Sequence, residues 1–372
     1  MDGITWLIWV VKALILIFGL LGGFAYLTLY ERRALARIQT RIGPNRAGPQ
    51  GILQPIADAV KLIFKEELTP AKADKLIFFV APIVTMVPSL VIAAVIPWGR
   101  SVTIGGREIT LYIADINVGV IFLMAIASIA VYGIVLAGWS SNNKYAMLGG
   151  LRSTAQMVSY ELSLGLSFVT VILLANSMRM LDIVEAQKSL WFVLIQPVGA
   201  LIFLTATLAE VNRAPFDMPE AEQELTAGYH SEYSGMKFAL FFMAEYQKMI
   251  VISAIAATVF FGGFLGPFVD RFPWLGPLYL IIKVIILLFG MIWVRATWPR
   301  IRYDRLMALG WKVMLPLAIA IVFITATGIL LAQQFGPVFM WLIPVVSLLA
   351  GAVAVGMIDR SIRRKNYAIA NP

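Results

Sequence analysis

Nine long apolar segments determine what this chain can fold into. Each has enough residues to cross about 30 Å of hydrocarbon as an α-helix. Across the whole sequence, 60% of the residues are hydrophobic and only 14% are charged, against about 25% charged in a soluble domain. We therefore expect an all-α polytopic membrane protein with about nine transmembrane helices, forming one membrane domain over residues 1–372. The segments are Ile4–Tyr30, Leu76–Ile96, Val118–Trp139, Thr154–Leu174, Leu190–Ala209, Phe238–Phe264, Pro277–Val294, Val313–Ala332 and Val338–Ile358.

Cysteine and histidine are almost absent, and this limits the chemistry of the chain. There is no cysteine, and His230 is the single histidine. Disulfides, thiolate metal sites, iron–sulfur ligation and a cysteine nucleophile are excluded, as is a metal cage built from several histidines. We predict no metal site, and any redox cofactor must lie on another chain. The net charge of +9 resembles that of a nucleic-acid-binding protein, but in a membrane protein Lys and Arg mainly set topology, so we expect no nucleic-acid partner.

The basic residues divide unequally between the two sides of the predicted membrane. Of the 30 Lys and Arg residues, 22 lie in segments 31–75, 140–153, 210–237, 295–312 and 359–372, and five lie in the loops between them. The positive-inside rule then places the N-terminus outside and the C-terminus in the cytoplasm. In the outer loop, β-forming residues alternate on both sides of Gly105–Gly106, which predicts a small hairpin over Val102–Leu111.

The first cytoplasmic loop, residues 31–75, contains an amphipathic segment. Between Gly51 and Glu67 the apolar residues recur at helical spacing, and Asp58 and Lys61 lie on the other face. This pattern predicts a helix lying along the membrane surface. Two interpretations stay open: the helix is only an interfacial anchor, or together with the neighbouring arginines it forms an entrance for an amphiphile that leaves the bilayer sideways.

The second large cytoplasmic loop, residues 210–237, is acidic where basic residues are expected. Clustered carboxylates repel one another, which raises the pKa of some of them and suits them to proton uptake and relay. The alternative is a solvated acidic loop that binds a basic partner surface, and calcium binding is a weaker third possibility because the spacing does not match an EF-hand. The acids are Glu210, Asp217, Glu220, Glu222, Glu224 and Glu232.

Two further carboxylates lie inside predicted transmembrane helices. Glu161 and Glu245 are each about 12–13 Å from the cytoplasmic end of their segment. An uncompensated charge at that depth costs several kcal/mol, so both should face protein or water. Lys248 follows Glu245 by three residues and is a plausible helical partner, which leaves a structural ion pair as an alternative for Glu245. Glu161 has no basic residue within one turn, and this favours a functional role.

Several long motifs resemble one known family. The two most specific are GILQPIADAVKL at Gly51–Leu62 and APFDMPEAEQEL at Ala214–Leu225. They are similar to signature stretches of the H-type, or first, membrane subunit of bacterial respiratory NADH:quinone oxidoreductase (complex I). Further similar stretches are ERRALARIQTRIGPNRAGP, GWSSNNKYAMLGGLR, SYELSLG and GYHSEYSGMKFALFFMAEY, so the resemblance covers most of the chain from Glu31 to about Tyr303. The segment 338–358 resembles the extra C-terminal helix of some bacterial members.

The resemblance implies a role and a location. Such a subunit joins the membrane arm to the peripheral arm, forms the membrane side of a quinone chamber and links quinone reduction to proton pumping in the prokaryotic plasma (inner) membrane. Quinone is then the substrate, flavin and iron–sulfur clusters lie on peripheral partner subunits, and antiporter-like membrane subunits are further partners.

The resemblance also assigns residues to these roles. The entrance would include Glu31, Arg32, Arg41, Arg46, Asp58 and Ala59. The proton path would include Glu161, Glu210, Asp217, Glu220, Glu222, Glu224, Glu232 and Glu245. Adjacent to the path would be Arg213, Tyr229, His230 and Lys248.

Other functions remain to be compared with this one. An anchor subunit of a membrane-bound hydrogenase or related dehydrogenase shares the intramembrane acids but does not always need a quinone entrance. A stand-alone proton or ion transporter would also place acids along a pathway, although no inverted repeat is visible in the sequence. A passive scaffold is disfavoured because carboxylates inside the membrane are expensive.

Overall fold

The structure is a computed structural model, which describes residues 3–104, 106–218 and 228–370. Within these ranges, eight helices are long and apolar enough to cross a membrane. The first six are α1 (Gly3–Ile38), α3 (Lys75–Ala93), α4 (Gly119–Ser140), α5 (Lys144–Ala175), α10 (Gly235–Phe260) and α11 (Leu275–Thr297). The seventh is the continuous run of α12 (Tyr303–Leu309), a π-helical turn at Gly310–Met314 and α13 (Leu315–Phe335). The eighth begins with a 3₁₀ turn at Pro337–Trp341 and continues as α14 (Leu342–Ala370). The predicted all-α membrane architecture is confirmed.

The fifth predicted span differs from the others because it is broken. Instead of one helix over Leu190–Ala209, the chain forms α7 (Phe192–Ile195) and α8 (Pro197–Glu210), with Gln196 in a non-helical conformation between them. Proline favours the first position of a helix because it has no N–H to leave unsatisfied there, so α8 begins at Pro197. With 14 residues, α8 is about 21 Å long. The buried Gln196 amide donates a hydrogen bond to Thr325 of α13, which partly satisfies this polar junction inside the bundle.

The predicted cytoplasmic loop over residues 140–153 is also shorter than expected. Only a tight turn separates α4 from α5, which begins at Lys144 rather than near Thr154. Asn143 caps the new start, because its side chain accepts a hydrogen bond from the Tyr145 N–H at 2.9 Å. Hydropathy placed the boundary too late, since the first turns of α5 are only moderately apolar.

Two smaller predicted elements are confirmed. The hairpin consists of β1 (Ser101–Ile104) and β2 (Arg107–Thr110), which pair antiparallel with Val102 opposite Ile109. The amphipathic segment forms α2 (Gln54–Ile63), preceded by a 3₁₀ turn at Pro49–Gly51. No residue of α2 is buried, and its apolar side chains Ile56, Val60 and Ile63 are exposed. Two short helical elements complete the fold, α6 (Met180–Ala186) and a 3₁₀ turn at Gly228–His230.

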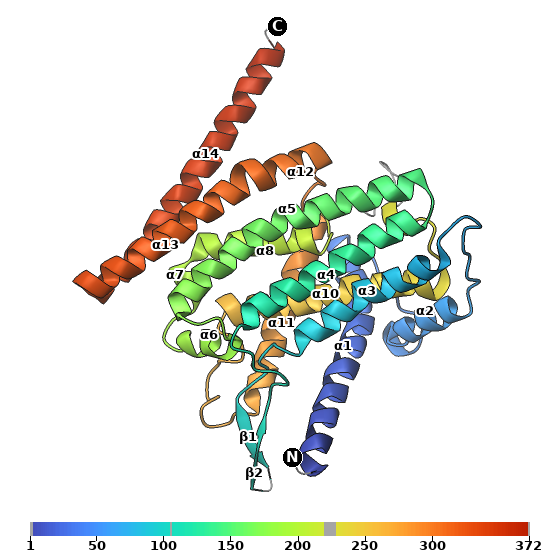
Figure 1. Cartoon of the computed structure of the whole chain (residues 1–372), viewed down its shortest axis with the longest axis horizontal. Helices are drawn as coiled ribbons and strands as arrows, with labels where there is room; N and C mark the ends of the chain where they lie inside the picture. Colours follow the sequence, from blue (N-terminus) through green and yellow to red (C-terminus); the bar gives the residue numbers. More distant parts are fainter. Residues whose placement is uncertain (1–2, 105, 219–227, 371–372) are drawn as a thin grey trace.

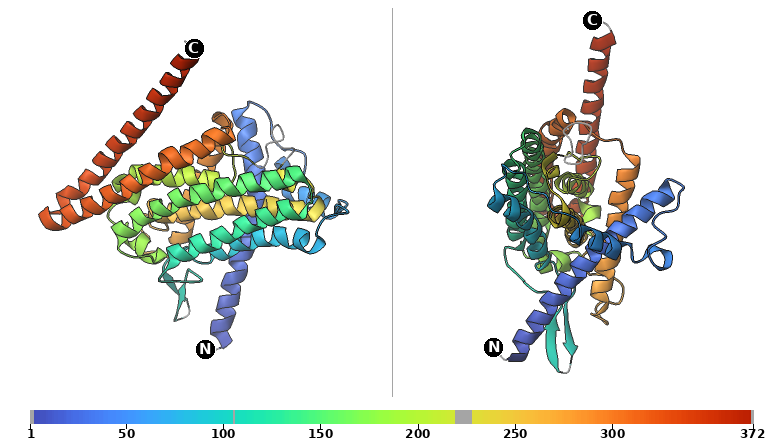
Figure 2. Two further views of the ribbon diagram at one scale, coloured as in Figure 1. Left: turned by 45° about the horizontal axis from the view of Figure 1, so that its top comes forward. Right: turned by 90° about the vertical axis from the view of Figure 1, so that its right-hand side faces the viewer.

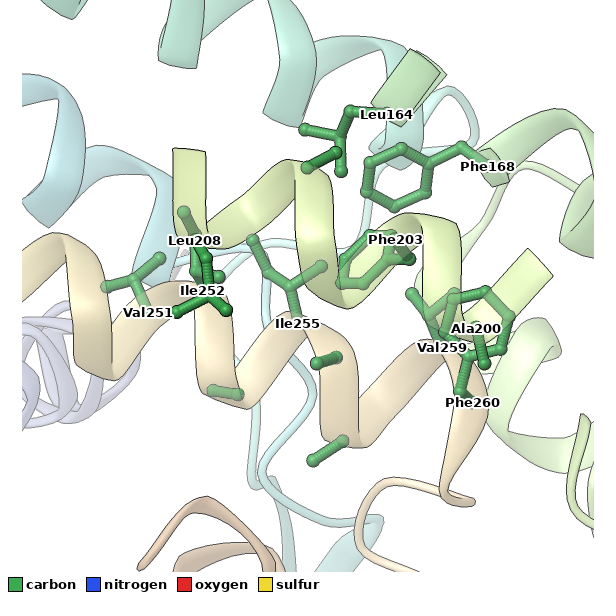
Figure 3. Packing of buried hydrophobic residues seen from close by; sticks show 14 of the residues in the cluster. Leu164, Phe168, Ala200, Phe203, Leu208, Val251, Ile252, Ile255, Val259 and Phe260 are labelled. Carbon is green, nitrogen blue, oxygen red and sulfur yellow. The ribbon is translucent and has the colours of Figure 1, made fainter. Parts of the chain in front are cut away.

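The core lies where α5, α8 and α10 meet. Phe203 of α8 packs edge-to-face against Phe168 of α5, with ring centroids 5.2 Å apart, and lies 5.3 Å from the ring of Phe260 on α10. Leu164, Ile255 and Val259 fill the space around these rings (Figure 3). The outward faces of the long helices carry large exposed apolar side chains, as expected where lipid replaces water.

The helices do not form a simple parallel bundle. α3, α4, α5 and α10 run alongside one another, and α1 crosses them at a steep angle (Figure 1). Both further views agree that the N-terminal end of α1 and the hairpin point to one end of the molecule, and the C-terminus to the other (Figure 2).

Candidate functional site

A buried network of charges lies near the C-terminal end of α1. Glu31 of α1 and Arg213, which follows α8, are only 2% and 3% exposed. The guanidinium of Arg213 lies 3.4 Å from a Glu31 oxygen and 2.7 Å from an oxygen of Glu245 on α10. Arg295 near the end of α11 contacts the same Glu31 oxygen. Removing one member of such a network leaves a buried charge uncompensated, which is strongly destabilising.

The environment of Arg213 keeps it charged. Burial alone would lower the pKa of Arg213, but the carboxylates of Glu245 and Glu31 raise the pKa above its ordinary value. The guanidinium also lies over the ring of Tyr246, 4.2 Å from the ring centroid, in a cation–π contact. Two carboxylates from two helices are therefore held around one permanent cation.

The predicted pairing of Lys248 with Glu245 is wrong. The Lys248 amine lies 3.0 Å from a Glu210 carboxylate oxygen and donates to the Glu210 carbonyl at 3.1 Å. Glu245 pairs instead with Arg213, across helices. Helical spacing suggested the local partner, but the side chain of Lys248 reaches the end of α8, where its positive charge compensates the terminal carbonyl as well as the carboxylate.

A small cavity of about 40 Å³ lies between Glu245 and the Lys248–Glu210 pair. Because one water needs about 10–15 Å³ of such space, the cavity has room for about three water molecules. Glu210, Glu245 and Lys248 line it, together with Tyr229 and His230. The structure thus brings together five of the residues singled out from the sequence, from α8, α10 and the segment between them.

Glu161 does not line this cavity. It is half-buried on α5, and its carboxylate accepts a hydrogen bond from the hydroxyl of Ser128 on α4. Among the residues that the structure describes, no cation forms an ion pair with Glu161. The neighbouring Ser159 and Tyr160 point elsewhere: the hydroxyl of Ser159 accepts from the Trp311 indole, and that of Tyr160 donates to a carbonyl.

The remaining acids of the second loop are placed only in part. Glu232 is half-buried and accepts a hydrogen bond from the Asn143 amide at 2.7 Å, next to the start of α5. Asp217 is half-buried in the segment after α8. Glu220, Glu222 and Glu224 lie outside the residues that the structure describes.

The predicted entrance residues surround the junction between α1 and α2. The guanidinium of Arg32 lies 2.7 Å from Asp58 of α2, and Gln54 donates to the other Asp58 oxygen at 3.2 Å. Ala59 is exposed beside this pair. Arg41 and Arg46 are exposed on the connecting segment. Glu31 and Arg32 therefore face in different directions, Glu31 into the buried network and Arg32 towards the surface helix.

An apolar groove of 1040 Å³ runs along α1 below this junction. Its walls are α1, α11 and the end of the hairpin, and it extends from Leu7 to Tyr30. Tyr30 immediately precedes Glu31 in the sequence, so one end of the groove approaches the charged network. In the described part of the chain, no group of three or more His, Cys, Asp or Glu side chains is arranged to hold a metal ion.

Sequence reasoning missed three contributors to the site. Ser128 lies 33 residues from Glu161, Arg295 lies 264 residues from Glu31, and Tyr246 is one aromatic among many on its helix. A local pattern of residues carries no signal for partners so distant in sequence.

Comparison with known proteins identifies the family. A family model described as NADH dehydrogenase matches residues 11–326. The chain is 53% identical over 314 residues to the NADH-quinone oxidoreductase H subunit numbered 2 of Geobacter sulfurreducens, covering 84% of this chain and 94% of that protein. It is 52% identical over 302 residues to the H subunit of the same enzyme from Protochlamydia amoebophila, covering 81% of this chain and 91% of that protein. It is also 52% identical over 310 residues to the H subunit from Thermomicrobium roseum, covering 81% of this chain and 89% of that protein. The chain therefore belongs to the NADH dehydrogenase family, the family of the H subunits of NADH-quinone oxidoreductase.

Proposed function

We propose that the chain is the membrane subunit of a proton-translocating NADH:quinone oxidoreductase that forms the entrance and membrane side of the quinone chamber. The observation that carries this proposal is the buried network of Glu31, Arg213, Glu245 and Arg295 beside the α1–α2 junction. A scaffold helix would be more stable with apolar residues at these positions, because desolvating the charges is expensive. Relatives with about 50% identity carry the name of that subunit.

The entrance accounts for the surface features of the first loop. A quinone with an isoprenoid tail is too apolar to leave the bilayer, so its chamber must open at membrane level. α2 keeps its apolar side chains exposed, as a helix seated in the interface does. The ion pair between Arg32 and Asp58 ties this helix to α1. The head group would pass between the two helices towards Glu31.

The carboxylates account for the coupling to protons. Reduction of a quinone to a quinol takes up two protons and changes the charge in a closed site. Glu31 and Glu245 share Arg213, and Glu245 shares the small cavity with Glu210, so a change of charge at one acid changes the electrostatic environment of the next. Glu161 and Glu232 would extend this path on α5 and in the second loop, with Asp217, Glu220, Glu222 and Glu224 as its loop members.

The proposal also fixes what other chains must supply. Electrons would arrive through flavin and iron–sulfur clusters on peripheral partner subunits, since this chain has no cysteine to ligate a cluster. Antiporter-like membrane subunits would carry the pumped protons. The complex would reside in a prokaryotic plasma membrane with the basic loops on the cytoplasmic side.

The entrance can be tested by comparing two electron acceptors. Arg32→Ala and Ala59→Trp should each lower quinone-dependent NADH oxidation about tenfold, a loss of about 1.4 kcal/mol in transition-state stabilisation. Electron transfer to a soluble artificial acceptor should be unchanged, because that acceptor takes electrons from the peripheral arm. The measurement is the ratio of the two activities in purified complex.

The matched control is Arg37→Ala, which removes an exposed arginine one turn further along α1 and should leave both activities intact. Loss of quinone activity in the control as well, or equal loss of both activities in the entrance variants, would contradict a local entrance and indicate misassembly.

A further inference from the structure

Lys12 is a cation inside the apolar groove along α1. Its amine donates a hydrogen bond to the Thr110 hydroxyl at 2.8 Å and lies 5.4 Å from the centre of the Trp9 ring. Neither partner carries a negative charge, and among the described residues no carboxylate pairs with Lys12. Thr110 can satisfy one of the three N–H groups of the amine, so two remain for another acceptor. A cation that faces hydrocarbon without an anion is costly.

The position of Lys12 along α1 matches the level of lipid phosphates. Lys12 and Glu31 are 19 residues apart on one continuous helix, which corresponds to about 29 Å. That is the thickness of the hydrocarbon core, about 30 Å. Since Glu31 ends the apolar part of α1 on the side of the basic loops, Lys12 lies towards the opposite side of the membrane. The hairpin strand that supplies Thr110 points to the same end of the molecule (Figures 1 and 2).

The groove between these two levels is shaped for a hydrocarbon chain. Its lining below Lys12 includes Ile15 and Gly19 of α1 and Ile281 and Ile285 of α11. Gly19 lies seven residues from Lys12, about 10 Å along the helix, which is within the length of one leaflet. A Cβ placed on Gly19 would meet no atom within 4 Å. No other helix of the described chain therefore packs closely against Gly19, and the missing side chain leaves the groove open at this point.

We propose that this groove is a binding site for an anionic phospholipid of the leaflet opposite the basic loops. The lipid phosphate would accept hydrogen bonds from the free N–H groups of Lys12, with the Thr110 hydroxyl beside it. One acyl chain would lie between α1 and α11, past Ile15 and Gly19. The unneutralised ammonium selects this occupant over an apolar partner helix, because a partner helix would cover the groove but leave the charge uncompensated. The Lys12 end of the groove, which would hold the head group, is the end far from Tyr30 and the proposed quinone entrance.

The test uses phosphatidylglycerol with a photoreactive group on one acyl chain, in nanodiscs that contain the whole purified complex. After illumination, labelled peptides are mapped by mass spectrometry. Labels should lie on α1 near Ile15 and on α11 near Ile281. Gly19→Leu adds a side chain to the groove at a position where a Cβ meets no atom within 4 Å, and should reduce this labelling at least fivefold. Lys12→Gln should reduce it as well, and Lys12→Arg should retain it.

The matched control is Gly290→Leu, because a Cβ placed on Gly290 of α11 also meets no atom within 4 Å but Gly290 does not line the groove. Labelling of the Gly290→Leu variant should equal that of the unmodified chain. Equal labelling in Gly19→Leu, or labelling that Lys12→Gln does not change, would overturn the proposal. So would cross-links from the groove residues to a helix of another subunit, which would show that a protein partner fills the groove. Quinone reductase activity is not the readout, so the outcome does not depend on the proposed function.

Discussion

At the scale of single residues, Glu161 is the member of the proposed proton path that is most directly tested by substitution. The sequence predicted its isolation, and among the described residues the structure gives it only a hydroxyl partner, Ser128, and no cation. A carboxylate that no cation holds ionised can exchange a proton when nearby charge changes. Its partner could not be predicted, because Ser128 and Glu161 lie on different helices. The same limit explains why Lys248 was assigned to Glu245: only local spacing was available, and the fold offered Glu210 instead.

Replacing Glu161 tests this role. Glu161→Gln keeps the size of the side chain but cannot titrate, and should lower both quinone reduction and proton translocation by about tenfold or more, since proton transfer by a positioned group contributes at least about 100-fold in many enzymes. Glu161→Asp should retain part of both activities. The measurement is NADH oxidation and acidification in membrane vesicles at equal complex content on native gels. Glu108→Gln, which changes an exposed acid of the hairpin, is the control. Pumping at the original rate in Glu161→Gln would show that the residue is only a buried hydrogen-bonded acid.

At the scale of elements, periodicity and turn chemistry predicted most of the helices and the hairpin, but not how the elements are joined. The break between α7 and α8 was missed because hydropathy counts Gln196 and Pro197 as one polar interruption in an apolar run. The segments next to the hairpin are joined by a group of charges that the sequence could not pair. Arg100, which follows α3, binds Glu185 of α6 through two hydrogen bonds of 2.6 and 2.8 Å, and Lys188 lies 2.8 Å from the same carboxylate. Arg100 also contacts Asp270 in the segment before α11.

This group of charges should make the stability of the fold sensitive to acid. Burial alone would raise the pKa of Glu185, but hydrogen bonds from Arg100 and Lys188 lower it below the ordinary value of 4.5. A carboxylate whose pKa is lower in the folded than in the unfolded state stabilises the fold at pH values above its unfolded-state pKa. This contribution is lost as the pH falls through the folded-state pKa. Thermal denaturation between pH 6 and about 3 should therefore show a loss of stability in the original chain that is smaller in Glu185→Gln. Parallel curves for the two proteins would contradict the assignment, and Glu108→Gln should follow the original chain.

At the scale of the whole molecule, the charges of the site come from segments far apart in the sequence. Glu31, Arg213, Glu245 and Arg295 meet only after α1, α8, α10 and α11 have packed. Composition and charge asymmetry predicted a polytopic membrane protein with its basic loops on one side, and the motif resemblance singled out Glu31, Arg213 and Glu245 but not Arg295. Neither could predict which acid shares which cation, because that depends on how the helices cross.

The central claim is that a quinone reaches the network at Glu31 through the junction of α1 and α2. The most direct measurement is photolabelling of the intact complex with a quinone that carries a photoreactive group on its ring, followed by mapping of the labelled peptides. The account predicts labels on the end of α1 and on α2, which excess unlabelled quinone suppresses and which Ala59→Trp reduces. Labels confined to other subunits, or labels on this chain that excess quinone does not suppress, would contradict it.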